Sequence, residues 1–199
     1  MRKIITTPDP RLREKSTKVN QITPEIEDII ADMRKLSIEW EKDHPYELSA
    51  AMAAPQIGEN KRIIIIRDDL DDKKHNSFTA LINPEIIRTE GKIVKEQEGC
   101  LSVPEIYGLV GRPYKVKVKA LLEDGNEVRI KADGFLARTL MHEIDHLDGI
   151  LFIDRIRDDE TAFYRMDDQG NLRPVTDYEN EIKNNHELFP EEWTLWVRR

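Results

Sequence analysis

The stretch Leu140–Gly149 reads LMHEIDHLDG and contains two histidines four residues apart, the first followed directly by a glutamate. On an α-helix this spacing places His142 and His146 on one face, one turn apart, so that both imidazoles can bind the same metal ion. Glu143 then lies beside that ion, where a carboxylate can move a proton from an activated water to a leaving group. The pattern predicts a helix that carries metal-assisted hydrolysis.

A hydrolytic metal normally has three protein ligands and one open position for water, so the two histidines need a third partner. Two protease patterns fail to supply it. A thermolysin-like site would have its glutamate near Met166, and the metzincin pattern would have a third histidine in place of Phe152. Cys100, the only cysteine of the chain, follows Gly99 and remains as the candidate. A thiolate and two imidazoles would leave one position for water.

Three separated motifs carry a resemblance to a known family. They are MAAPQIG at Met52–Gly58, EGCLS at Glu98–Ser102 and HEIDH at His142–His146. In this order they resemble the motifs of peptide deformylases, which remove the formyl group from the initiator methionine of new bacterial and organellar polypeptides. The resemblance covers roughly residues 1–156, and three motifs in one order are far more specific than any one of them.

The resemblance implies a division of labour at the site. Gln56 and the backbone N–H of Leu101 would hold the formyl oxygen and stabilise the tetrahedral intermediate, while Glu143 carries the proton from water to the departing amine. The implied cofactor is one divalent ion, most often Fe(II) in this family, although zinc, nickel or cobalt satisfy the same ligands. The implied metal ligands are Cys100, His142 and His146.

The segment Ser49–Gln56 is rich in small residues, which let a substrate backbone lie close to the chain. The family usually has glycine at the positions of Ser49 and Ala51. A Cβ at residue 51 can crowd a peptide or oppose a positive φ, so these two replacements bear directly on substrate binding. By their positions in the family, the resemblance implies that the residues contacting the substrate are Ala50, Ala51, Gly99, Ile106, Tyr107, Phe135 and Arg138.

The function that the sequence predicts is removal of the N-formyl group from N-formylmethionyl nascent polypeptides, with release of formate. Two alternatives remain. One is a catalytically weak, deformylase-like binder of formylated peptides, because of the altered Ser49 and Ala51. The other is a metallopeptidase, against which the missing protease ligand patterns argue.

The remaining patterns predict an α+β fold. Residues 23–42 have apolar side chains at helical spacing, with Thr23 as N-cap. Four isoleucines within Lys61–Arg67 indicate a buried strand. Alternation of charged and apolar residues in 114–121 indicates a strand with one solvent-exposed face. Asp133 is a plausible N-cap for the helix that follows. We expect mixed or antiparallel β-sheets packed around a late helix that carries the H-E-x-x-H motif, with an additional N-terminal helix.

The composition of the chain limits which binding partners and which cellular location can be expected. The net charge of -8 argues against a broad nucleic-acid surface, and no apolar run is long enough to cross a bilayer. We expect no DNA and no membrane partner, and a cytoplasmic enzyme whose thiol stays reduced. Residues 1–156 are expected to form the catalytic domain, and residues 157–199 an acidic extension packed on it. Its charge opposes stable docking on ribosomal RNA, so the extension gives no support to an association with the ribosome, even a transient one.

Overall fold

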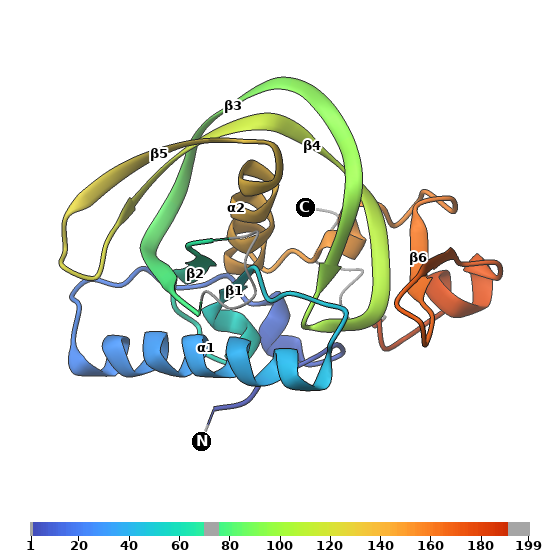
Figure 1. Cartoon of the computed structure of the whole chain (residues 1–199), viewed down its shortest axis with the longest axis horizontal. Coiled ribbons are helices and arrows are strands. Elements are labelled where there is room, and N and C mark those ends of the chain that lie inside the picture. The colour runs from blue at the N-terminus through green and yellow to red at the C-terminus, as the bar shows by residue number, and fades with distance from the viewer. Residues whose placement is uncertain (1, 70–75, 191–199) are drawn as a thin grey trace.

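The computed structural model describes residues 2–69 and 76–190. Within this part of the chain, seven strands form one sheet in which neighbouring strands run antiparallel, and β3 (Phe78–Cys100) and β4 (Val103–Leu121) are much longer than the others. They bend over helix α2 (Gly134–Leu147), which the shorter strands Ala51–Ala53, Ile63–Arg67 and Glu127–Asp133 also contact (Figure 1). Register shifts interrupt the pairing of β3 with β4, and irregularities of this kind let long strands curve. In sheet order the strands are β1 (Ala51–Ala53), β2 (Ile63–Arg67), β3 (Phe78–Cys100), β4 (Val103–Leu121), β6 (Phe163–Met166) and β7 (Leu172–Pro174), while β5 (Glu127–Asp133) also pairs with β4.

Two α-helices pack against this sheet, and the predicted α+β class is confirmed. Helix α1 (Pro24–Asp43) lies along one side and buries one apolar stripe. Helix α2 (Gly134–Leu147) is instead buried at every residue from Ala137 to Leu147, because the curved sheet surrounds it. The remaining helical segments are the 3-10 helices Pro10–Arg13, Ala54–Ile57 and Phe152–Arg155 and the π-helical turn Glu179–Lys183.

Both predicted N-cap residues lie directly before their helices, but neither makes the expected side-chain hydrogen bond. The backbone carbonyl of Thr23 accepts hydrogen bonds from the N–H groups of Ile26 and Glu27, which begins α1 without the hydroxyl. Asp133 also ends β5, where it pairs with Lys115 of β4. None of the helices in the described residues is long and apolar enough to span a membrane.

The chain after residue 157 adds to the outer edge of β4. Strand β6 pairs with residues 106–108 of β4, and Phe163 lies opposite Gly108. A Cβ built on Gly108 would lie 2.3 Å from Cδ1 of Ile156, so the absent side chain makes room for this contact. One buried apolar cluster includes residues from both sides of this junction, among them Val103, Ile106, Phe152, Phe163, Ile182, Leu188 and Phe189.

Removing the Phe163 side chain should therefore destabilise the whole protein. Phe163 is buried, so Phe163→Ala should lower the free energy of unfolding by about 3–5 kcal/mol in urea titrations followed by circular dichroism. Arg173→Ala, at an exposed position of the neighbouring β7, is the control and should change it by less than about 0.5 kcal/mol. An unchanged unfolding midpoint in Phe163→Ala would show that this cluster does not stabilise the fold.

Candidate metal centre and active site

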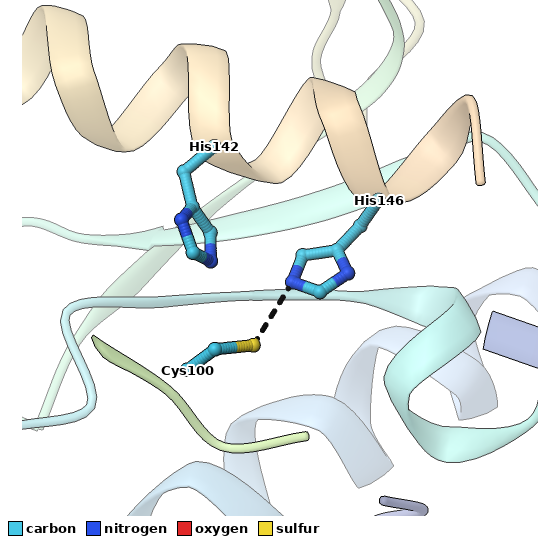
Figure 2. A group of neighbouring side chains, drawn as sticks. All are labelled: Cys100, His142 and His146. Carbon is cyan, nitrogen blue, oxygen red and sulfur yellow. Dashed lines mark hydrogen bonds between the residues drawn. The ribbon is translucent and has the colours of Figure 1, made fainter. Parts of the chain in front are cut away.

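Helix α2 and the end of β3 bring together three side chains of types that can bind a metal ion. His142 and His146 project from one side of α2 toward Cys100, the last residue of β3 (Figure 2). The Sγ atom of Cys100 lies 3.2 Å from Nε2 of His146. One ligand atom from each of the three residues lies within 4.8 Å of the others. The structure therefore gathers one sulfur and two imidazoles from distant parts of the sequence into a group of the size that a single ion requires.

Glu98 fixes the orientation of His142. Its Oε2 atom lies 2.9 Å from Nδ1 of the imidazole, and a carboxylate acceptor at Nδ1 leaves the lone pair of Nε2 for a metal. Arg112 holds the same carboxylate through two hydrogen bonds of 2.6 and 2.8 Å. Burial alone would raise the pKa of Glu98, but the hydrogen bonds from Arg112 and His142 outweigh it and hold the pKa well below its usual value.

Glu98 and Arg112 form an ion pair with a nitrogen–oxygen distance of 2.6 Å. In the structure each side chain is only 4% exposed, so the pair is buried. Arg112 also donates to Asp145 at 2.8 Å, and Asp145 accepts a further hydrogen bond from Arg155 at 2.6 Å. Asp145 therefore acts on the candidate centre through Arg112 and Glu98. Removing one member of such a chain would leave another charge buried without its partner.

The two histidines differ in the charge that their surroundings favour. Burial lowers the pKa of His146 far below its usual value, and the nearby His142 lowers it further. For His142 burial acts in the same direction, but the neighbouring Cys100 and the hydrogen-bonded Glu98 outweigh it and raise the pKa. The surroundings thus favour the neutral form of His146, which can bind a cation directly, and the protonated form of His142, whose proton would compete with a bound metal ion.

Two buried polar atoms at this centre have no hydrogen-bond partner among the described residues: Nδ1 of His146 and Oε2 of Glu143. Buried polar atoms of native proteins are nearly always satisfied, and at functional sites an ion, a water or a substrate often does so. A soft sulfur with two imidazoles suits a first-row transition metal, so the donor set fits a divalent ion. Burial raises the pKa of Glu143 to about 7, which suits a carboxyl that must both accept and donate a proton.

Gln56 lies on the other side of the sulfur. It belongs to the short helix Ala54–Ile57, and its Oε1 accepts a hydrogen bond from the backbone N–H of Ala53 at 2.8 Å. That bond turns the amide NH2 group toward the centre, where Nε2 lies 3.5 Å from Sγ of Cys100 and 3.3 Å from Oγ of Ser102. Leu101 lies in the turn between β3 and β4. Ser102 belongs to the EGCLS motif, but no role was predicted for it from the sequence.

A cavity of about 280 Å³ adjoins this centre. Most of the residues expected to contact substrate line it, with one exception. Ile106 is only 2% exposed and packs in the cluster with Phe163, because neighbouring residues of a strand face opposite sides of the sheet and Tyr107 faces the cavity. The expected residues that do line it are Ala50, Ala51, Gly99, Tyr107, Phe135 and Arg138.

The structure adds details of the cavity wall that the sequence did not predict. Arg138 is held by Glu98 at 2.6 Å, by Glu96 at 3.1 Å and by two backbone carbonyls, so it is a fixed part of the wall. Ala51 lies in β1 and does not have a positive φ, so the backbone conformation does not require glycine at this position. Trp40, Tyr46, Glu47, Leu48, Thr139 and Met166 also line the cavity, and no local motif marks them in the sequence.

Comparison with known proteins gives one consistent result. The family model described as polypeptide deformylase matches residues 1–162. A peptide deformylase of Thermomicrobium roseum is 44% identical over 172 residues, which cover 85% of this chain and 93% of the relative. A peptide deformylase of Halothermothrix orenii is 48% identical over 148 residues, or 74% of this chain and 88% of the relative.

Solved structures agree with the sequence relatives. The crystal structure of a peptide deformylase from Legionella pneumophila is 39% identical, with a TM-score of 0.69, over 78% of this chain and 85% of that one. A peptide deformylase from Synechococcus elongatus, crystallised in complex with actinonin, is 38% identical with a TM-score of 0.67, over 77% of this chain and 78% of that one. By sequence and by structure, this chain belongs to the peptide deformylase family.

Proposed function

We propose that this enzyme uses one divalent metal ion to remove the N-formyl group from N-formylmethionyl peptides, with release of formate. The observation that carries the proposal is the group formed by Cys100, His142 and His146 beside Glu143, in the wall of a cavity. Deformylases are metal-dependent, and this donor set suits the family's usual Fe(II) as well as zinc, nickel or cobalt. When bound, the ion would supply Lewis-acid activation of water and of the formyl carbonyl.

The chain's own residues would do the rest of the chemistry. Glu143 takes the proton from the attacking water and gives it to the departing amine, so that one formyl C–N bond is broken and one C–O bond is formed. The amide NH2 of Gln56 and the backbone N–H of Leu101 would donate hydrogen bonds to the formyl oxygen as negative charge develops on it. The position of Gln56 near the sulfur supports this role.

A peptide can reach the centre along strand β1. Among the described residues β1 is at one end of the sheet order and pairs only with β2, so its other edge can accept an extended peptide as an additional strand. Ala50 and Ala51, next to this edge, line the cavity. Their small side chains allow a substrate backbone to come close, and the regular backbone of Ala51 argues against the view that its Cβ reduces the protein to a passive binder.

We also propose that residues 1–156 form the catalytic unit and that residues 157–199 are an extension of it. Acidic residues outnumber basic ones in the extension, which opposes docking on ribosomal RNA through this segment. Formylated chains are substrates only where translation takes place, so we propose a cytoplasmic location. A metallopeptidase activity has less support, because Phe152, at the third-histidine position of metzincins, is buried in the core.

Protein reconstituted with Fe(II) without oxygen should release formate from formyl-Met-Ala-Ser but no acetate from acetyl-Met-Ala-Ser. Glu143→Ala should reduce kcat by about 10²–10⁴-fold, the usual contribution of general acid–base catalysis. Glu187→Ala, at an exposed position, should leave kcat unchanged. Undiminished formate release by Glu143→Ala would refute the proton carrier, and cleavage of internal peptide bonds would identify a peptidase.

Metal binding can be tested separately with cobalt. The wild-type protein titrated with Co(II) should develop a near-ultraviolet thiolate-to-cobalt absorption band. Cys100→Ala should lose this band and bind cobalt at least about tenfold more weakly, because even outer hydrogen-bond partners of ligands change affinity by about 10–100-fold. His186→Ala, which removes an exposed histidine, is the matched control and should retain the band. If Cys100→Ala keeps it, the sulfur is not a ligand.

A further inference from the structure

Strand β6 places one side chain of the C-terminal segment at the cavity. Strand β6 lies beside β4 (Figure 1). Tyr164 of β6 lies directly opposite Tyr107 of β4, and Met166 follows two residues later on the same face. On the opposite face, Phe163 is buried in the apolar cluster, which fixes the register of the pair. A slip by one residue would expose Phe163 and turn Met166 away from the cavity, so the fold specifies the position of Met166.

Tyr107 connects three segments around the cavity mouth. Its hydroxyl donates a hydrogen bond to the carboxylate of Glu47, in the loop between α1 and β1, and contacts the sulfur of Met166 at 3.8 Å. Its ring lies against Gly99, where a Cβ would be 2.6 Å from the ring atom Cε1. Burial and the nearby Glu47 carboxylate raise the pKa of Tyr107, so the phenol remains a hydrogen-bond donor at neutral pH. Met166 therefore rests on a fixed side chain.

The turn after β6 contacts the opposite rim. Gly170, in the turn between β6 and β7, approaches Tyr46 so closely that a Cβ built on it would lie 2.8 Å from Cγ of the ring. Tyr46 belongs to the same loop as Glu47, and Tyr46, Glu47 and Met166 all line the cavity. The β6–β7 hairpin thus extends from β4 to the loop that follows α1, along the mouth of the cavity.

The cavity has a buried end and a more exposed end. Glu143, Arg138 and Thr139 are buried beside the candidate metal centre, whereas Tyr107 and Met166 are half-buried and Tyr46 is exposed. A formyl group that reaches Glu143 must enter the buried end. The part of the peptide that follows the methionine would then lie toward the exposed end, where Tyr107 and Met166 line the cavity.

We infer that Met166, supported by Tyr107, is a specificity-determining residue that gives the side chains after the methionine an apolar contact. The inference rests on the proposed deformylation, because that reaction sets the direction of the peptide. Methionine is flexible and polarisable, so it can adapt to different apolar partners. Contact with such a side chain favours leucine over glycine at the second or third position of the substrate, and the gain appears as a lower KM.

The test compares formyl-Met-Gly-Ser, formyl-Met-Leu-Ser and formyl-Met-Ser-Leu. In wild type the leucine peptides should have the higher kcat/KM, and Met166→Ala should reduce this preference by about 3–10-fold through KM, the size of effect expected for a few buried methylene groups. Met166→Leu should restore the preference. In both Met166 variants kcat at saturation should stay within about twofold of the wild-type value. Arg173→Ala, on the same hairpin but exposed, is the control.

The inference would be overturned by an unchanged leucine preference in folded Met166→Ala, or by an equal loss for all three peptides, which would indicate a structural role. Binding of the product peptide Met-Leu-Ser, measured by calorimetry, tests the contact with Met166 independently of catalysis. If wild-type protein releases no formate, the proposed function fails. Weaker binding of Met-Leu-Ser but not of Met-Gly-Ser by Met166→Ala would still support the contact, and equal binding by both proteins would refute it.

Discussion

The packing of α2 inside the curved pair of strands β3 and β4 is the constraint on which the rest of the structure depends. An α-helix buried at every residue over three turns must be surrounded, and α2 is surrounded because β3 and β4 bend over it while β1, β2 and β5 also pack against it (Figure 1). The same bend carries the end of β3 back to the helix, so that Cys100 lies opposite His146. The candidate metal centre therefore follows from the way in which the core is packed.

Burying this centre requires that its charges have partners. Glu98 comes from β3, Arg112 from β4, Asp145 from α2 and Arg155 from the short helix that follows. Their ion pairs connect four elements and end on His142 through the carboxylate of Glu98. Such a network contributes little net stability compared with an apolar core, but it fixes the imidazole in one orientation. We therefore infer that this network positions His142, a candidate metal ligand.

The sequence predicted which side chains gather at the candidate metal centre better than it predicted the packing around them. His142, Glu143 and His146 follow from helical spacing alone, and the EGCLS motif points to Cys100, because local patterns and co-ordered motifs carry this information. Local sequence patterns do not show which distant segments of the chain pack together. Ile106 was expected at the substrate pocket, yet strand alternation turns it into the core while Tyr107 faces the cavity. Met166 entered the sequence argument only as a mismatch to a protease pattern, and its place at the cavity depends on the pairing of β6 with β4.

The most direct test of this account is a crystal structure of the metal-loaded protein with anomalous diffraction measured at the absorption edge of the ion. The account predicts one anomalous peak bonded to Sγ of Cys100 and to one nitrogen each of His142 and His146, at about 2.3 Å and 2.0–2.1 Å if the metal is zinc, with a position left for water. A peak elsewhere, or an ion held by both imidazoles with the sulfur outside bonding distance, would contradict it.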